Sequence, residues 1–332
     1  MEEPSVSILV TFYNQEKYVD KALNSIFQQK TSIPVKIIVG DDGSSDRTRD
    51  FVKKWMEKYP DVLEMHVMER SKDEAYVGGF RASRNRLNLL QYVTTKYFIF
   101  LDGDDYYEYD EKIQRQVEIL EKRENQDCIA CGHNCDMLYQ GGKRVPISST
   151  TLPEGKIDPK TYWGKEYFHT DTLLIRSSVI PSLQTKLLEN NFNDNLITFA
   201  VIQFGSIYYV PKSWVVYLQT GDGIWTSGKM TVNLIRNVIA YDLCNLINPK
   251  MKRETRNKYS YAWFELFKIR KAIDAKELIP YVSEAQDKKL RESLLWLSYQ
   301  DMNLFQKIVF DCKTVIIAKK QFLDAIKLRL KR

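Results

Sequence analysis

The sequence lacks any continuous run of about 20 apolar residues, the length that an α-helix needs to cross a bilayer. It also has few cysteines: five among 332 residues, an odd number that argues against a disulfide scaffold and for a reducing compartment. The acidic first residues run directly into a strand-like segment, so a secretory signal is not expected. Internal repeats and low-complexity tracts are absent. These absences favour a cytoplasmic protein with an ordinary globular core.

The net charge of +6 is concentrated near the C-terminus, where residues 313–332 carry seven Lys or Arg against the single acid Asp324. Apolar residues recur there at roughly helical spacing, which predicts a basic amphipathic helix. Two roles stay open: the helix lies on anionic lipid at the inner face of a membrane, or its apolar stripe packs on its own domain. The basic excess is not interleaved with aromatic residues along one face, which argues against nucleic-acid binding.

The first 110 residues alternate between short apolar runs and amphipathic segments. Buried strands are predicted at residues 6–11, 36–40, 64–68 and 97–101. These runs are short and continuous, which is typical of strands covered on both faces. Helices are predicted between them, the first capped by Asn14 and the second by a residue of 44–46. Strand–helix repeats with short connections indicate an α/β fold, with a mostly parallel sheet between helices.

The rest of the chain is expected to form two further regions. From about residue 128 to 225 the pattern is mixed, with one helix near 192–204. Beyond about 230 it is helical, with a break at Asn248–Pro249. We therefore expect an α/β domain over residues 1–225, followed by a C-terminal helical region over 226–332 that associates with a membrane, with a partner or with its own domain.

Three carboxylates, Asp102, Asp104 and Asp105, directly follow the strand predicted at 97–101. They would repel one another unless a positive group lay between them, and ligands of parallel sheets bind beyond the carboxyl ends of the strands. A hard divalent cation such as Mn²⁺ or Mg²⁺ prefers carboxylate, water and phosphate oxygens. The D-x-D spacing puts the first two carboxylates on the same side of an extended chain, so one could reach a metal and the other a ribose hydroxyl. The alternative is a solvated acidic turn.

Other polar side chains fall beyond the same strand ends. Tyr13 could stack on a base, Asp42 could accept a hydrogen bond from the N–H of a uracil edge, and Arg84 could donate to phosphate. Each has an ordinary alternative: a surface tyrosine, an acidic β-turn and an arginine on a helix face. Together they favour a nucleotide site.

The segments that carry these side chains resemble one family over a long stretch. VSILVTFYNQEKYVDKALNSIFQQ followed by VKIIVGDDGSSDRT is similar to the opening of the family 2 glycosyltransferases. GGFRASRN resembles the family's G-x-x-x-ARN segment, with Ser83 where alanine is commoner, and FLDGDD resembles its D-x-DD metal motif. The resemblance is strong over about residues 5–110 and looser over 110–225. It implies the GT-A nucleotide-diphospho-sugar transferase fold and inversion of the anomeric centre.

The resemblance also implies a binding site for a UDP-sugar donor. Thr11, Tyr13 and Asp42 would hold the uracil and the ribose, and Arg84 would lie near the diphosphate or the sugar. Family members often have a mobile loop over the donor, and residues 220–228 match it, with Trp225 covering a sugar ring. The alternative is a linker in which this tryptophan is buried.

The three carboxylates of the D-x-DD motif would divide the ribose contact and the metal between them. The resemblance does not say which one touches the ion. Asp102 is assigned here to the donor, and Asp104 or Asp105 is preferred as the ligand of Mn²⁺ or Mg²⁺. An ion that bridges a diphosphate neutralises the charge that develops as the diphosphate leaves.

An inverting transfer needs a base for the proton of the acceptor hydroxyl. In the family this carboxylate begins a helix beyond the middle strands, often as an E-D pair, and the matching stretch here is NNFNDNLITFAVIQFG. Asp194 is therefore the predicted base, with Asn193 in place of the usual acid. The alternative is that Asp194 only caps the helix. His169 is predicted either to contact the acceptor or leaving diphosphate, or to be structural.

The expected function is transfer of a hexosyl or N-acetylhexosaminyl group from UDP to a hydroxyl of a glycan or lipid-linked acceptor. The basic C-terminal segment suggests work at the inner face of a bacterial membrane, in the synthesis of capsule, lipopolysaccharide or another surface polysaccharide. One alternative is a sugar-1-phosphate nucleotidyltransferase, although the loop after the first strand lacks the glycines that would cradle a triphosphate. The other is a non-catalytic sugar-nucleotide-binding protein.

Overall fold

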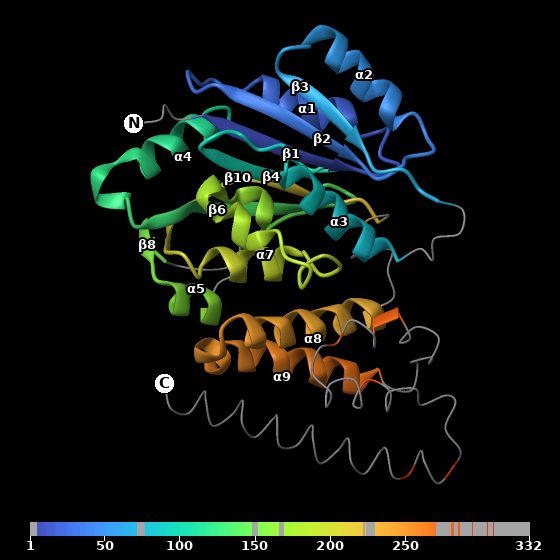
Figure 1. Cartoon of the computed structure of the whole chain (residues 1–332), viewed down its shortest axis with the longest axis vertical. Coiled ribbons are helices and arrows are strands. Elements are labelled where there is room, and N and C mark those ends of the chain that lie inside the picture. The colour runs from blue at the N-terminus through green and yellow to red at the C-terminus, as the bar shows by residue number, and fades with distance from the viewer. Residues whose placement is uncertain are drawn as a thin grey trace. The chain divides into compact units, whose positions relative to one another are not determined.

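The computed structural model describes residues 5–71, 77–147, 152–165, 169–221, 223 and 230–269, with the isolated positions 280, 281, 285, 294, 304 and 308. The chain divides into two compact units, Met1–Asp222 and Gly223–Arg332 (Figure 1). Trp225 and the basic segment 313–332 lie outside the described residues, so the predictions made for them are not examined by the structure.

The first unit is built on a mixed sheet with the strand order β3-β2-β1-β4-β9-β6-β10-β5. Its strands are β1 Val6–Phe12, β2 Val35–Asp41, β3 Leu63–Val67, β4 Tyr97–Asp102, β5 Tyr106–Tyr107, β6 Cys128–Tyr139, β7 Arg144–Pro146, β8 Gly155–Ile157, β9 Leu174–Arg176 and β10 Ser206–Gln219. Strands β3, β2, β1 and β4 run parallel to one another, and β9 is antiparallel to both β4 and β6. The four strands predicted in the first 110 residues are confirmed.

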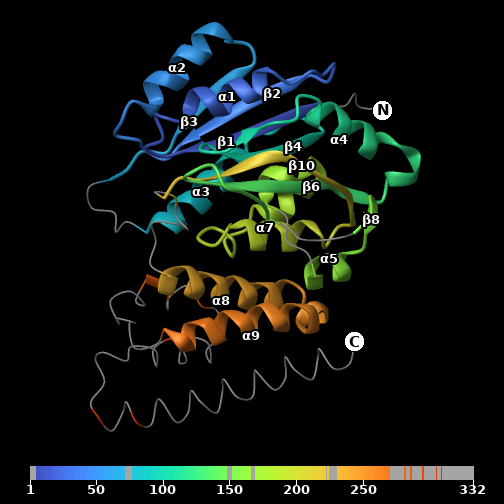
Figure 2. The same cartoon turned by 180° about the vertical axis from the view of Figure 1, so that it is seen from behind.

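Helices cover both faces of this sheet. They are α1 Val19–Phe27, α2 Thr48–Lys58, α3 Gly78–Leu90, α4 Lys112–Glu121, α5 Pro159–Lys165, α6 Ile180–Leu183 and α7 Asp194–Val201, with short 3₁₀ turns η1 Arg123–Asn125, η2 Thr170–Thr172 and η3 Ser177–Val179. Helices α1 and α2 lie on one face, and α3 and α7 lie on the other (Figures 1 and 2). The predicted α/β class, with a mostly parallel sheet between helices, is therefore confirmed.

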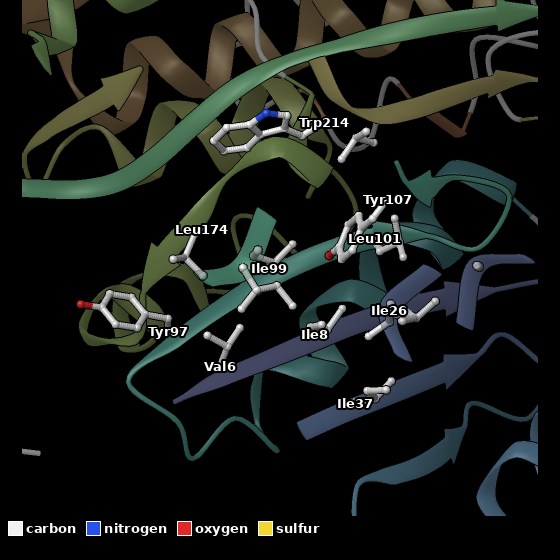
Figure 3. Packing of buried hydrophobic residues seen from close by; sticks show 14 of the residues in the cluster. Val6, Ile8, Ile26, Ile37, Tyr97, Ile99, Leu101, Tyr107, Leu174 and Trp214 are labelled. Atoms are coloured by element: carbon white, nitrogen blue, oxygen red, sulfur yellow. The ribbon is translucent and has the colours of Figure 1, made fainter. Parts of the chain in front are cut away.

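Alternation along the strands builds the larger core. Side chains two residues apart on a strand point to the same face, and Ile8 of β1, Ile37 of β2 and Ile99 of β4 belong to one buried cluster with Ile26 of α1 (Figure 3). These three side chains are at most 1% exposed. Replacing one such residue with alanine typically costs about 2–5 kcal/mol. The core therefore fixes the register in which the strand ends align.

Both predicted helix caps are wrong: the N-cap position of α2 is Arg47, with no side-chain cap hydrogen bond, and Asn14 does not cap α1. Helix α1 begins at Val19 with no side-chain cap, whereas Asn14 has a φ of 50° and lies before the helix. The Oδ1 atom of Asn14 instead accepts from the N–H groups of Ser45, at 2.8 Å, and Asp46, at 3.4 Å. Its side chain thus joins the loop after β1 to the loop after β2, and the two loops support each other at the same edge of the sheet.

The second unit contains α8 Met230–Ile247, η4 Pro249–Met251 and α9 Lys252–Lys268. Asn248 separates α8 from η4, and its side chain accepts a hydrogen bond from the N–H of Lys250 at 3.0 Å. The predicted break at Asn248–Pro249 is therefore confirmed. None of the helices in the described ranges combines the length and the apolar composition needed to cross a bilayer.

Lys112, the first residue of α4, is fully buried in the first unit. Its Nζ atom donates to Oε1 of Gln116 at 2.9 Å and lies 4.3 Å from the centroid of the Tyr107 ring. Burial lowers the pKa of Lys112 from its ordinary 10.5 to about 7, although the nearby Asp171 raises it. A buried ammonium is therefore retained below this pH at a cost in stability.

We expect Lys112→Met to raise the free energy of unfolding by about 2 kcal/mol at pH 6, after the lost bond to Gln116 is deducted. The unfolded chain holds the lysine proton up to about pH 10.5, whereas the folded chain releases it near pH 7. The cost of the buried charge is full below pH 7 and declines as the pH rises, so the advantage of the variant should shrink toward pH 10. Urea unfolding at pH 6, 8 and 9.5 measures this; a constant difference would contradict it.

Candidate active site

Four side chains that can bind a metal gather where β4 ends. Asp102 is the last residue of β4, Asp105 lies three positions later, and His169 and Asp171 come from the segment around η2. Each offers one ligand atom, and these atoms all lie within 4.8 Å of one another. Asp105, His169 and Asp171 are buried. We call these four residues the acidic cluster.

The acidic cluster contains buried oxygens without hydrogen bonds. Oδ1 of Asp105 accepts from the N–H of Leu218 at 2.8 Å, and Oδ2 of Asp171 accepts from the N–H of Asp102 at 3.2 Å. Among the described residues, Oδ2 of Asp105 has no hydrogen-bond partner, and Oδ1 of Asp171 has none but lies 3.4 Å from Nδ1 of His169 as an ion pair. Such an oxygen is costly to bury unless a proton or a cation lies beside it. Three carboxylates and an imidazole therefore fit a divalent cation, and the carboxylates favour Mn²⁺ or Mg²⁺.

Protons balance part of the negative charge in the acidic cluster. Burial raises the pKa of the Asp105 carboxyl well above its usual range, and Asp171 and Asp104 raise it further. Burial lowers the pKa of His169, but Asp171 and Asp194 outweigh it and raise this pKa to about 9. The imidazole nitrogens lie 3.4 Å from Oδ1 of Asp171 and 3.5 Å from Oδ2 of Asp194. Binding of a divalent cation here would therefore release protons.

Asp104 lies next to the acidic cluster in sequence but is not one of its four residues. The pKa of Asp104 is raised to about 7, mainly by burial and next by the charge of Asp102. Sequence reasoning preferred Asp104 or Asp105 as the metal ligand, and of these two the structure brings Asp105 together with other ligand groups. The assignment of Asp104 stays a prediction.

Tyr13 and Asp42, predicted to hold the nucleoside, meet around Arg70. The guanidinium of Arg70 lies 3.6 Å from the centroid of the Tyr13 ring. It donates to both the carbonyl oxygen and Oδ2 of Asp42 at 2.6 Å. Arg81 of α3 donates to Oδ1 of the same carboxylate at 2.7 Å. Burial raises the pKa of Asp42, and the two arginines oppose this shift. An aromatic ring thus lies close to a carboxylate that two guanidinium groups orient.

Asp194, the predicted base, is the first residue of α7 but does not cap this helix. The cap is Asn193, whose Oδ1 accepts from the N–H of Leu196 at 3.1 Å. The alternative reading of Asp194 as a cap is therefore wrong. Oδ1 of Asp194 accepts from Nη1 of Arg86 at 2.8 Å and from Oγ1 of Thr170 at 3.2 Å.

The same Arg86 also binds the end of β4. Its Nη2 atom donates to Oδ1 and Oδ2 of Asp102 at 2.6 and 2.8 Å. Thr11 of β1 donates to Oδ1 of Asp102 at 3.3 Å. Arg86 is only 8% exposed. Its guanidinium connects Asp102, which is predicted to contact the donor, with Asp194, which is predicted to act as the base.

Arg84, two residues before Arg86 on α3, reaches other partners. Its Nε donates to Oδ1 of Asn190 at 2.9 Å and lies 3.5 Å from Oε1 of Glu189. Neither partner belongs to the acidic cluster. The role of Arg84 near the diphosphate or sugar, like that of Trp225, stays a prediction.

Sequence reasoning missed Arg86, although a signal for it was present. Residues three and four positions apart share a face of a helix, and Arg86 has this spacing to Leu89 and Leu90. Both leucines are buried against the sheet, so the period places Arg86 on the inner face of α3. A buried arginine on an apolar helix face needs a carboxylate partner, and Asp102 of the D-x-DD motif supplies one.

Comparison with known proteins identifies the family to which a chain with this fold and site belongs. Residues 7–183, more than half of the chain, match the family described as Glycosyl transferase family 2. The chain therefore belongs to this family, as its motifs predicted. Membership argues against the nucleotidyltransferase alternative.

Individual relatives are distant in sequence. An uncharacterised protein of Mycobacterium tuberculosis is 23% identical over 231 residues, which cover 67% of this chain and 61% of that relative, so the chain spans about three fifths of its length. A processive diacylglycerol beta-glycosyltransferase of Mycoplasma pneumoniae is 24% identical over 293 residues, which cover 80% of this chain and 82% of the relative. Among solved structures, TarS 1-349 of S. aureus has a TM-score of 0.60 at 15% identity, covering 99% of this chain and 92% of that one. The predicted GT-A fold is confirmed.

Proposed function

We propose that the protein is an inverting, metal-assisted glycosyltransferase that moves a hexosyl or N-acetylhexosaminyl group from a UDP-sugar to an acceptor hydroxyl. The observation that carries this proposal is the arrangement at the strand ends: an acidic cluster whose ligand atoms could hold a cation, with Arg86 joining Asp102 to the candidate base Asp194. Family membership supports the reaction class.

The donor would lie along the ends of β1, β2 and β4. Asp42, oriented by two arginines, would accept from the N–H of uracil, and Tyr13 with Arg70 would offer stacking surface. Thr11 and Asp102, already hydrogen-bonded to each other, would face the ribose. TarS has been solved with UDP and with UDP-GlcNAc, and a mannosyltransferase of Pyrobaculum calidifontis, with a TM-score of 0.51, has been solved with GDP-Man and Mn²⁺. The ligands bound in these structures support a nucleotide-sugar donor.

In the transfer step, the acceptor oxygen forms a bond to the anomeric carbon while the bond from that carbon to the diphosphate oxygen breaks. The sugar configuration inverts, and UDP leaves. Asp194 would take the proton of the acceptor hydroxyl, because its carboxylate is 15% exposed and is oriented by Arg86 and Thr170. Asp105 and Asp171, together with Asp102, would hold Mn²⁺ or Mg²⁺, which when bound neutralises the charge on the leaving diphosphate.

For the acceptor we propose a hydroxyl of a lipid or of a lipid-linked glycan. The Mycoplasma pneumoniae relative, which aligns with most of the chain, is named for a diacylglycerol acceptor. Seven basic residues in the segment 313–332 agree with work beside anionic lipid, in the synthesis of a bacterial surface glycan.

A panel of sugar nucleotides tests the proposal. We expect the protein with Mn²⁺ to release UDP from one UDP-hexose or UDP-N-acetylhexosamine, and diacylglycerol or lipid-linked saccharide to accelerate the release. Chelation of the metal should stop it. The proposal would be refuted if calorimetry detected no binding of UDP in the presence of Mn²⁺ and the protein turned over no donor.

A further inference from the structure

Arg86 joins three elements at the candidate base. Its side chain starts on α3, pairs with Asp102 at the end of β4 and reaches Asp194 at the start of α7. Helix α3 is itself held close to β2: Nδ2 of Asn85 donates to the carbonyl of Gly40 at 2.9 Å. A Cβ atom on Gly40 would lie 2.4 Å from Oδ1 of Asn85, so this approach needs glycine. The starting point of Arg86 is therefore fixed by the backbone.

We propose that Arg86 is a positioning residue for sugar transfer, a role that rests on the function proposed above. Its guanidinium holds the carboxylate of Asp194 at a set distance and orientation from the carboxylate of Asp102. The base on α7 is thereby aimed at the point where the acceptor hydroxyl meets the donor. Arg86 acts through Asp194 and does not itself take the proton.

The shape of the guanidinium carries this role, beyond its charge. A lysine would also supply one positive charge beside these carboxylates. An ammonium is a compact point charge, however, whereas a guanidinium presents its N–H groups in a rigid planar fork. Nη2 of Arg86 spans both oxygens of Asp102 while Nη1 reaches Asp194, a geometry that an ammonium cannot reproduce.

A second donor acts on the same carboxylate oxygen. Thr170 of η2 donates through Oγ1 to Oδ1 of Asp194 at 3.2 Å, and Nε2 of His169 lies 3.5 Å from Oδ2. The Thr170 residue is fully buried. Groups from two different elements therefore hold the carboxylate of Asp194. Of these groups, Arg86 also binds Asp102, the residue proposed to contact the donor.

Arg86→Lys tests the inference, with the donor and acceptor that the unchanged protein uses best. We expect kcat of transfer to fall about 100-fold, because a small displacement of a reacting group has this cost. The Kd of UDP with Mn²⁺ and the KM of the donor should stay within about threefold, because the charge beside Asp102 is kept. The matched control is Arg176→Lys: Arg176 donates to the carbonyls of Cys128 and Leu120 away from the acidic cluster, and its loss should lower stability but leave kcat unchanged.

The outcomes separate the two proposals. If the unchanged protein turns over a donor and Arg86→Lys transfers at a similar rate, the positioning role is wrong and the proposed function stands. A loss of UDP affinity equal to the loss of kcat would also overturn it, because Arg86 would then serve the donor. If the unchanged protein has no activity, both fall. If Arg86→Lys does not fold, Thr170→Val gives the same test: kcat should fall about fivefold, the effect of one lost hydrogen bond, with the KM of the donor unchanged.

Discussion

Asp194→Asn is expected to lower the rate of sugar transfer about 1,000-fold while UDP still binds in the presence of Mn²⁺. Asparagine keeps the shape of the side chain and an oxygen for Arg86 and Thr170 but has no basic carboxylate. The donor contacts proposed at Thr11 and Asp42 belong to other elements and do not include Asp194. The loss should therefore appear in kcat and not in the Kd of UDP, which calorimetry measures directly.

The neighbouring residue supplies the control for this variant. Asn193 caps α7 through its bond to the N–H of Leu196, so Asn193→Ala should cost about 1 kcal/mol of stability. It should leave kcat close to that of the unchanged protein at a temperature where both are folded. An Asp194→Asn enzyme that retains full activity would refute the base, whereas equal losses in both variants would mean that the start of α7, and not the carboxylate, is required.

Local sequence patterns were sufficient for the sheet and for part of the site. The buried strands in the first 110 residues are short, continuous apolar runs rich in β-branched residues. The alternation of strands and helices then leaves few possible strand orders for the sheet. In the resulting sheet Thr11 pairs with Asp102, and Phe12 pairs with Asp41. The convergence of polar residues at one edge therefore follows from the order of the strands.

The residues that sequence reasoning missed depend on contacts between distant segments. Asp171 follows no periodic pattern, and it reaches Asp102 because η2 lies beside β4, 69 positions away in sequence. Asn14 is of a residue type that often caps helices. The loop after β2 instead donates two backbone N–H groups to its side-chain oxygen, and the helix begins only later. Local propensity competes with such long-range hydrogen bonds and loses where two loops meet.

Asp105→Asn is expected to have opposite effects on the metal-free protein and on metal binding. The Asp105 carboxyl is buried, and the charges of Asp171 and Asp104 oppose its ionisation. The unfolded chain loses this proton at a lower pH than the folded chain, so at neutral pH folding must take up a proton at Asp105. A neutral amide of the same shape avoids that cost, so at neutral pH the metal-free variant should unfold at a higher temperature than the unchanged protein. The same change removes a ligand, so Mn²⁺ should no longer stabilise the variant.

The size of the metal effect makes this test decisive. When free Mn²⁺ exceeds its Kd 100-fold, the free energy of unfolding of the unchanged protein should rise by about 2.7 kcal/mol. Thermal unfolding with and without Mn²⁺ should show this rise in the unchanged protein, most of it in Asp104→Asn, and almost none in Asp105→Asn. The reverse pattern, with the rise lost in Asp104→Asn and kept in Asp105→Asn, would assign the ion to Asp104. Stabilisation kept in both variants would remove Asp105 from the metal site, because an amide oxygen cannot replace the charge that a carboxylate offers to a hard cation.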